Sequence, residues 1–356
     1  MRLICHIGMP KTATTFIQDS MAANRGWLDR HGVCYPQLRS HISNHITLLF
    51  AAAEYIGAFH RDYGIHSLPV AQAFRRALVA DFEDEVAQCC GRINTFIVSS
   101  ENLTANMAGP AVQNLGAMFK PIFDEIRIIC YVRRQDDATL SMYAEHLKEG
   151  YSAHNIEEFI RLILAPDGIE PYLRFRRTMT PWIEVFGKEA IEVRIFDKQY
   201  LYEGDVLKDF LSVVFDGDLP EMTDFIPAGT SGMNVGLSAP ALEFLRRIGE
   251  RYPRYRDGQG NPDRIRLRDR IIALPTQPRP VMFAEISREI MAHFRPANDW
   301  LRENFFSHLP APLFPPRQNL TGDSNIGRIT RDEFIRFATH VFGDPAPVID
   351  LADDLQ

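Results

Sequence analysis

Residues 1–20 read MRLICHIGMPKTATTFIQDS, and this stretch decides the fold expected of the 356-residue chain. The apolar run Arg2–Ile7 has the residue types of a buried β-strand and ends at Gly8-Met9-Pro10. Helical periodicity starts near Thr14 and continues to about Leu28. A strand that turns at once into a helix is the repeating unit of an α/β domain.

Further strand and helix candidates follow over the first two thirds of the chain. Thr95–Ser99 and Ile126–Val132 are compact β-branched runs of the length expected for buried parallel strands, and Ala190–Ile195 is another candidate. Helical spacing follows at Asp136–Lys148 and at Val206–Val214. The sequence therefore predicts an α/β fold in which a mostly parallel sheet is flanked by helices.

The last third of the chain has a different pattern. Ser238–Glu250 and Met282–Phe294 are predicted to be amphipathic helices. We expect a connection rich in proline, glycine and arginine between them, at residues 253–280. A final helix is predicted at Arg331–Val341. This part of the chain is expected to be mostly helical.

Length and composition bound the class of protein. Apolar residues make up 46% of the chain and charged residues 24%, which excludes a disordered or fibrous protein. Because no clean linker interrupts the chain, we predict a single domain over residues 1–356. Its α/β core is expected at residues 1–220 and its helical C-terminal portion at residues 221–356.

The net charge is negative, because 39 lysines and arginines face 46 aspartates and glutamates, which gives −7 at pH 7. A chain of this charge is not expected to bind nucleic acid or a membrane surface through its overall field. An anionic ligand would need a local basic patch. No apolar run is long enough to span a bilayer, so no transmembrane segment is expected.

The cysteines indicate a reducing compartment. Their number is odd and their spacing irregular, which fits neither a zinc ligand set nor a disulfide framework. The first residues lack the apolar core and cleavage site of a signal peptide. We therefore expect a cytoplasmic protein with reduced thiols, at Cys5, Cys34, Cys89, Cys90 and Cys130.

A candidate anion site lies between the first strand and the first helix. The first turn of a helix carries unpaired N–H groups and the positive end of the helix dipole. Lys11 adds a positive charge there, and Thr14 and Thr15 add hydroxyl groups. The Walker A pattern is not matched, because the lysine precedes the paired hydroxyls by three residues. The alternative is an ordinary strand–helix turn with a solvated lysine and threonines that cap the helix.

This segment resembles the 5′-phosphosulfate loop of sulfotransferases that use 3′-phosphoadenosine 5′-phosphosulfate (PAPS), in which the pattern is Pro-Lys-x-Gly-Thr-Thr. Here Ala13 stands at the usual glycine, a departure that matters if the backbone is left-handed and is harmless if it is helical. The resemblance implies that PAPS binds to Pro10, Lys11, Thr12, Ala13, Thr14 and Thr15.

A second motif strengthens the resemblance. In the family an arginine at a strand end and a serine eight positions later bind the 3′-phosphate of the donor, and Arg133 and Ser141 have this spacing. Arg134 is a weaker candidate for the arginine. The alternatives are a salt bridge of Arg133 with Asp136 or Asp137, and a Ser141 hydroxyl that bonds within its own helix.

The resemblance implies a P-loop fold related to nucleotide kinases and a sulfuryl transfer from PAPS to a hydroxyl, with 3′-phosphoadenosine 5′-phosphate (PAP) as the product. Lys11 would neutralise the charge on the leaving phosphate, and no metal is required. The expected acceptor is a carbohydrate or another small hydroxylated molecule. The remaining alternatives are an ATP-dependent small-molecule kinase and a nucleotide-binding module without catalysis.

Three further residues are candidates for the site. Family members use a glutamate or a histidine as the general base, and Glu101, which follows the Thr95–Ser99 strand, is the first choice. His45 is the second choice, although a lone histidine is more often structural. Arg328 could close over the nucleotide, as a basic C-terminal loop does in the family.

Nine arginines between residues 246 and 270 form a basic run. This run either lines a groove for an anionic acceptor or is a solvated face compensated by nearby carboxylates, and we favour the second interpretation.

Overall fold

The computed structural model divides the chain into two compact units. The first unit comprises Met1–Arg133 and Pro171–Gly229, and the second comprises Arg134–Glu170 and Thr230–Gln356. Residues 134–170 therefore group with the C-terminal residues, and the single domain remains a prediction. Cys90 lies outside the described residues, which are 1–57, 60–61, 63–89, 91–105, 107, 109–229, 236–317 and 323–356.

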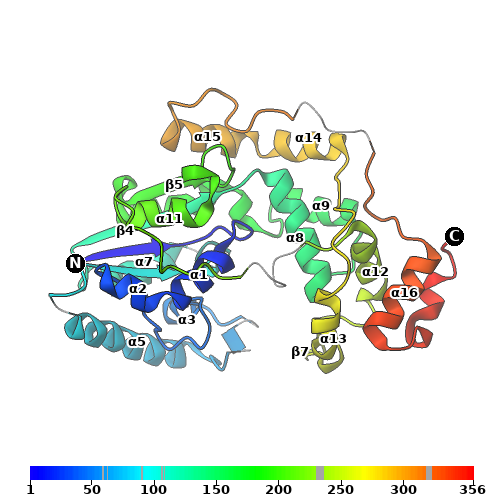
Figure 1. Ribbon diagram of the computed structural model, residues 1–356, viewed down its shortest axis with the longest axis horizontal. Helices are drawn as coiled ribbons and strands as arrows, with labels where there is room; N and C mark the ends of the chain where they lie inside the picture. The colour runs from blue at the N-terminus through cyan, green and yellow to red at the C-terminus, as the bar shows by residue number, and fades with distance from the viewer. Residues whose placement is uncertain are drawn as a thin grey trace. The chain divides into compact units, whose positions relative to one another are not determined.

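The first unit contains a five-stranded parallel sheet in the order β2-β3-β1-β4-β5, which confirms the predicted α/β class (Figure 1). All four predicted strands match within a residue, and the two-residue β2 is too short to be recognised from sequence. The strands are β1 Arg2–His6, β2 Val33–Cys34, β3 Thr95–Ser99, β4 Glu125–Val132 and β5 Ile191–Ile195.

The strand β1 is central, with β3 on one side and β4 on the other. In the parallel register, His6 at the carboxyl end of β1 pairs with Ser99 of β3 and Ile129 of β4. The chain leaves β1 toward β2 and β3 and later crosses to β4, so the carboxyl end of β1 is a topological switch point. Open α/β sheets bind ligands at such points.

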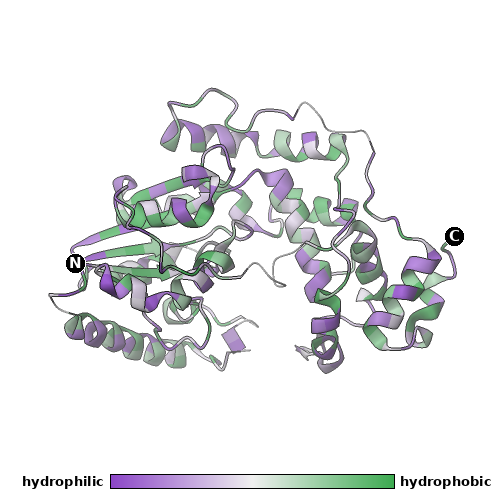
Figure 2. Cartoon of the chain, viewed as in Figure 1, coloured by the Kyte–Doolittle hydropathy of each residue, from purple (hydrophilic) through white to green (hydrophobic). Residues whose placement is uncertain are grey.

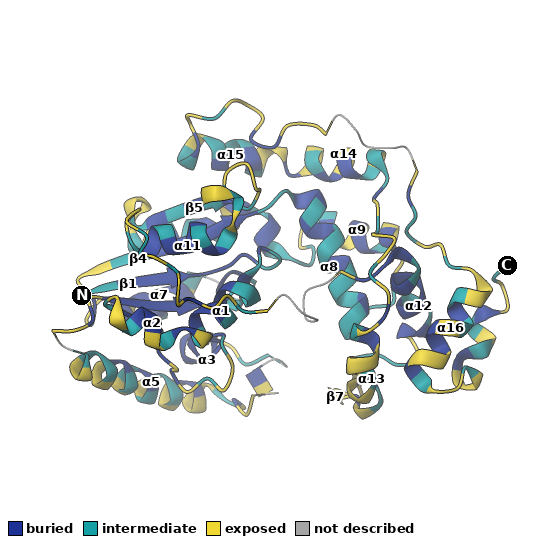
Figure 3. Ribbon diagram, in the orientation of Figure 1, coloured by how far each residue is buried: buried dark blue, intermediate teal, exposed yellow. Residues whose placement is uncertain are grey.

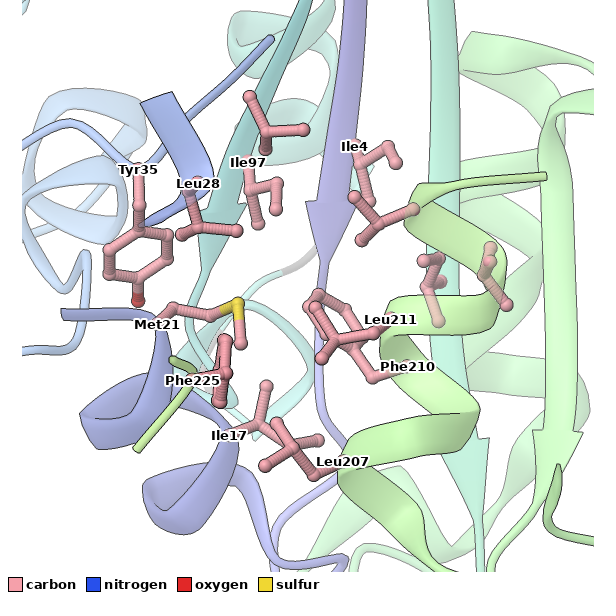
Figure 4. Close-up of a cluster of buried hydrophobic side chains, with 14 of the residues drawn as sticks. Ile4, Ile17, Met21, Leu28, Tyr35, Ile97, Leu207, Phe210, Leu211 and Phe225 are labelled. Carbon is pink, nitrogen blue, oxygen red and sulfur yellow. The ribbon is translucent and has the colours of Figure 1, made fainter. Parts of the chain in front are cut away.

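Alternate residues of the strands face opposite sides of the sheet. Ile4, Ile97 and Ile129 join a cluster of buried side chains with the helices α1 and α11 (Figure 4). On the other face, the ring of Phe96 of β3 packs against that of Phe123, which follows α7. The helices and 3-10 turns of this unit are α1 Thr14–Ala23, α2 Arg25–Arg30, α3 Thr47–Ala52, α5 Leu68–Gln88, α6 Asn102–Ala105, α7 Gly109–Phe119, α10 Phe175–Phe186, α11 Val206–Val214, η1 Pro171–Leu173, η2 Lys188–Ala190 and η3 Tyr202–Gly204.

The predicted helix at residues 14–28 is wrong in its length, because it is divided at Asn24. The Asn24 side chain donates to the carbonyl oxygens of Ser20 and Ile226, at 2.7 Å each, and accepts the N–H of Ile226 at 2.9 Å. These bonds tie a distant segment to the end of α1. A tertiary contact therefore ends a helix whose periodicity continues.

The second unit is mostly helical, as expected of the C-terminal part of the chain. The connection predicted at residues 253–280 is wrong in part, because it contains the helix α13, which begins at Pro262 after an Asn261 cap. Its arginine-rich side chains hide the apolar period. The elements of this unit are α8 Gln135–Glu149, α9 Ile156–Leu164, α12 Ala239–Gly249, β6 Tyr255–Arg256, β7 Gln259–Gly260, α13 Pro262–Ile272, α14 Ala284–His293, α15 Arg295–Phe305, α16 Arg331–Phe342 and η4 Ala346–Ala352.

Hydropathy and burial agree in the first unit, where the central strands are largely hydrophobic (Figure 2) and largely buried (Figure 3). Among the described helices, none combines the length and the apolar character needed to cross a membrane.

Candidate functional site

The segment between β1 and α1 starts as an extension of the sheet. The N–H groups of Ile7 and Met9 donate to the carbonyl oxygens of Ile129 and Tyr131, at 2.9 Å each, and the N–H of Tyr131 donates to Gly8 at 2.7 Å. The backbone then leaves the sheet and enters α1 at Thr14. We call residues 8–13 the phosphate loop, after the ligand that the sequence predicts for it.

Gly8 brings this loop against Glu101. Its φ of +101° lies in the region that favours glycine, and a Cβ atom built on it would lie 3.0 Å from both Cα and Cβ of Glu101. A side chain at this position would therefore push the loop away from the carboxyl end of β3.

Two other loop residues have left-handed backbones without being glycine. Lys11 has a φ of 66° and Ala13 a φ of 60°. Glycine would adopt this backbone conformation at position 13 without strain. Ala13 adopts it at a cost of about 1 kcal/mol in conformational free energy. Ala13 immediately precedes α1 and has no side-chain oxygen to cap the first-turn N–H groups. First-turn N–H groups of this kind can donate hydrogen bonds to an anion bound in the loop.

The threonines of the motif differ in their environment. Thr12 is fully buried, and its hydroxyl donates to the carbonyl oxygen of Met9 at 2.6 Å, so it braces the loop from within. Thr14 is buried in the first turn of α1, whereas Thr15, Pro10 and Lys11 are half-buried.

Arg133 contacts the phosphate loop. It follows the last residue of β4, and its Nη1 donates to the carbonyl oxygen of Lys11 at 2.9 Å. Its guanidinium carbon also lies 5.7 Å from the centre of the Phe196 ring. The structure therefore brings together Arg133 and Lys11, which the sequence selected as parts of two separate motifs.

The other charged residues near that motif are engaged in the second unit. Arg134 pairs with Asp136, with an Nη2–Oδ2 distance of 3.0 Å, and Arg317 pairs with Asp137. Ser141 is half-buried on α8. Arg134, the weaker arginine candidate, is thus held in an internal ion pair.

Arg328 is exposed in the second unit and is one of the residues that line a surface pocket of about 400 Å³. The pocket also contains a carboxylate, Glu333, and is lined by Pro240, Pro278, Asn325, Gly327, Arg328, Ile329, Thr330 and Glu333.

The basic run of the second unit is compensated, as favoured from the sequence. Arg264 is buried and donates to the carbonyl oxygens of Leu147 and Lys148 at the end of α8. Ion pairs link Arg246 and Arg247 with Glu243, Arg247 with Asp354, Arg251 with Asp350, Arg254 with Glu149, and Arg256 and Arg266 with Asp263.

Glu101 is held at the carboxyl end of β3 by two amide groups. Its Oε2 accepts from Nε2 of Gln18 at 2.8 Å and from Nδ2 of Asn44 at 2.9 Å. Gln18 belongs to α1, and Asn44 precedes α3. The half-buried carboxylate is thus fixed beside the phosphate loop by donors from two distant segments.

A buried polar chain continues behind Gln18. Its Nε2 also donates to Oγ of Ser99 at 3.2 Å, and that hydroxyl bonds to Nδ1 of His6 at 2.8 Å. His6 packs between the rings of Tyr131 and Phe210, and its burial lowers its pKa to about 3. Its imidazole is therefore neutral at physiological pH.

His45 has both ring nitrogens in structural hydrogen bonds. Nδ1 accepts the N–H of Ser99 at 3.0 Å, and Nε2 donates to the carbonyl oxygen of Pro36 at 2.7 Å. Its backbone N–H donates to the Ser99 carbonyl oxygen at 2.9 Å, and burial lowers its pKa to about 4. This geometry favours a structural role for His45 over that of a base, because neither nitrogen is placed to take a substrate proton.

Gln18 and Asn44 were not selected from the sequence. Gln18 lies one helical turn after Thr14, which directs it toward the sheet, but no motif identifies it. Asn44 directly precedes His45, the second candidate for the base, but no motif identifies Asn44 itself. In the described part of the chain, no group of three or more histidine, cysteine or acidic side chains is arranged to hold a metal ion.

Comparison with known proteins finds no matching family model and no matching solved structure. One similar protein comes from Archaeoglobus fulgidus and is described as an uncharacterized protein. It is 30% identical over 125 residues, which cover 35% of this chain and 30% of that protein. The chain thus spans less than a third of the length of this relative, whose description carries no activity.

Proposed function

We propose that this chain is a PAPS-dependent sulfotransferase of the P-loop type, which transfers a sulfuryl group to a hydroxyl of a carbohydrate or another small acceptor. The observation that carries the proposal is one cluster at the carboxyl edge of the sheet. In it, the phosphate loop with Lys11 adjoins both Arg133 and Glu101, and Gln18 of α1 donates to the Glu101 carboxylate.

The phosphate loop is proposed to bind the 5′-phosphosulfate of the donor. The first-turn N–H groups of α1 and the Lys11 ammonium would neutralise its negative charge. Lys11 would also stabilise the charge that develops on the bridging phosphate oxygen as PAP leaves. The proposal therefore assigns charge compensation to the protein and requires no metal ion.

Arg133 is proposed to bind the 3′-phosphate of PAPS, for which a planar guanidinium offers paired hydrogen bonds. The Arg133 guanidinium is oriented by its hydrogen bond to the Lys11 carbonyl oxygen. Lys11 belongs to the loop that is proposed to hold the 5′-phosphosulfate. The resemblance adds Ser141 of α8 as a second ligand of this phosphate. Arg328 remains a proposed basic contact with the nucleotide.

Glu101 is the proposed general base. As the acceptor oxygen bonds to sulfur, the S–O bond to the PAP phosphate breaks and the acceptor proton passes to Glu101. PAP leaves with the electron pair of the broken bond. In-line positioning of acceptor and donor then carries much of the rate.

A cytoplasmic location is part of the proposal. It is supported by the free thiols of Cys5, Cys34, Cys89 and Cys130, which suit a reducing compartment.

The Lys11→Ala variant tests the function. We expect sulfuryl transfer from PAPS to a panel of hydroxylated acceptors to fall by on the order of 100- to 1,000-fold, as for loss of one oxyanion-stabilising donor. Thermal unfolding should change little, because Lys11 is only half-buried. Phosphoryl transfer by the wild type from ATP in the presence of magnesium, without sulfuryl transfer from PAPS, would identify a kinase. Full sulfuryl-transfer activity of Lys11→Ala would contradict the proposed role of the loop.

A further inference from the structure

The contacts of Glu101 are unevenly divided between its two oxygens. Oε2 accepts two N–H groups, whereas Oε1 accepts no hydrogen bond in the part of the chain that the structure describes. An ionised carboxylate can only accept, so Gln18 and Asn44 must both turn their NH₂ groups toward it. The orientation of both amides is therefore determined by Glu101.

Each donor is itself anchored. Gln18 is 1% exposed, and its Nε2 has a second acceptor in Ser99. Asn44 is 7% exposed, and its backbone carbonyl oxygen accepts from Oγ of Ser40 at 2.6 Å. The three hydrogen bonds of His45 fasten the residue that follows Asn44 to the end of β3 and to Pro36.

We propose that Gln18 and Asn44 are positioning residues that hold Oε2 of Glu101 and leave Oε1 as the atom that takes the acceptor proton. This inference rests on the proposed function. Two neutral donors orient the carboxylate without the full neutralising charge of an arginine or lysine, which would make it a much weaker base. The amide pair thus aligns the base and keeps it reactive.

We call Gln18 and Asn44 the amide clamp of Glu101, and titratable groups lie around it. His6 and His45 are buried and neutral, and Arg133 donates to the backbone carbonyl oxygen of Lys11 in the phosphate loop. The phenol of Tyr35 interacts electrostatically with Glu101, and also with Arg25 and Asp19. Loss of one amide donor should therefore act on Glu101 directly.

Gln18→Met and Asn44→Leu remove one donor each at similar volume. We expect kcat to fall on the order of 10- to 100-fold, because a small misplacement of a reacting group has such an effect. The KM for PAPS should stay within about twofold. The acid limb of the pH–rate profile should move to higher pH, because N–H donors favour the charged form of a carboxylate. Gln88→Met, at an exposed position of α5, is the matched control and should behave as wild type.

Gln18→Glu covers the case in which the apolar variants do not fold. It keeps the volume and places a second carboxyl group beside Glu101, which should move the acid limb further to higher pH. The side-chain amide NMR signals of Gln18 and Asn44 give a readout without turnover. Their hydrogens should exchange slowly in wild type and faster in Glu101→Ala.

Two kinds of failure are separable. Wild-type kcat and pH profile in Gln18→Met, or amide signals that do not respond to Glu101→Ala, would overturn the clamp and leave sulfuryl transfer intact. Absence of PAP binding and of sulfuryl transfer in the wild-type protein would overturn the proposed function and with it the catalytic role of the clamp.

Discussion

The phosphate loop contains a glycine that the fold requires and an alanine that the fold only tolerates. Gly8 has a left-handed backbone and no room for a Cβ atom beside Glu101, whereas Ala13 has a left-handed backbone and already carries one. Strained backbones persist where surrounding contacts hold them, and they concentrate at functional sites. Exchange of glycine for alanine at position 8 and of alanine for glycine at position 13 should therefore change stability in opposite directions.

We predict that Gly8→Ala lowers the free energy of unfolding by about 2 kcal/mol or more, because both the backbone and the contact with Glu101 become unfavourable. Ala13→Gly should raise it by up to about 1 kcal/mol, because relief of strain exceeds the added entropy of the unfolded chain. Denaturant unfolding measures both changes.

Ala80→Gly, at an exposed position inside α5, is the control for the second substitution and should cost about 1 kcal/mol. A loss of stability in Ala13→Gly as large as that of Ala80→Gly would show that position 13 has no left-handed strain.

The buried histidines predict a pH dependence of stability. Burial lowers the pKa of His6 to about 3 and that of His45 to about 4, below the unfolded value of 6.5. Between about pH 4 and 6.5 the unfolded chain binds more protons, so stability rises with pH in this window and is lost as the pH falls. Each histidine contributes a slope of up to about 1.4 kcal/mol per pH unit.

His45→Gln should flatten this slope by the contribution of one proton, although it also removes a structural contact and lowers stability at pH 7. Unfolding free energies at pH 7, 6 and 5 measure the slope. His41→Gln, at an exposed position, should leave the slope unchanged. An equal slope in His45→Gln and wild type would show that His45 is not buried as a neutral ring.

At the scale of elements, one buried ion pair fastens α11 to the sheet. Asp209 of α11 is fully buried and accepts two bonds from Arg194 of β5 and one from the hydroxyl of Tyr131 of β4 at 2.7 Å. It also accepts the N–H of Tyr202 at 2.7 Å. This network crosses two strands, a helix and a turn.

We predict that Asp209→Asn lowers the free energy of unfolding by about 1 to 3 kcal/mol, because a neutral amide cannot replace all four hydrogen bonds that the buried carboxylate accepts. Asp218→Asn, at an exposed position shortly after α11, is the control and should change it by less than about 0.5 kcal/mol. Equal stability of the two variants would contradict the structural role of the pair.

The strands could be predicted because each is a compact β-branched run between turn residues. The helix boundaries were less predictable where a distant contact decides them. Asn24 ends α1 through bonds to Ile226, more than 200 positions away, and α13 has an arginine-rich surface without apolar periodicity. Local pattern carries information about an element, whereas its ends depend on tertiary contacts.

At the scale of the whole chain, a net charge of −7 is compatible with an anion site, because an anion responds to the basic residues nearest to it. Most arginines of the basic run are paired with carboxylates in the second unit, and Arg133 donates to the backbone carbonyl oxygen of Lys11 in the phosphate loop. A local basic site in an acidic protein would bind an anionic nucleotide without general affinity for polyanions.

The candidate site was predictable only where a motif is contiguous. Lys11, Arg133 and Glu101 each stand at the end of a recognisable strand, and parallel strands bring such ends to one edge. Gln18 and Asn44 reach Glu101 across 83 and 57 positions of the chain. Nothing in their local sequence shows that they share a carboxylate oxygen.

Calorimetric titration of the wild-type protein with PAP and with ADP, in the presence of a chelator, measures whether the chain recognises the 3′-phosphate of the donor. We expect PAP to bind at least about tenfold more tightly than ADP, because the 3′-phosphate gains charge-assisted hydrogen bonds from Arg133. The Arg133→Ala variant should lose most of this difference. Equal affinity of the wild-type protein for PAP and ADP would show that the chain does not bind the 3′-phosphate and is not a PAPS-dependent enzyme.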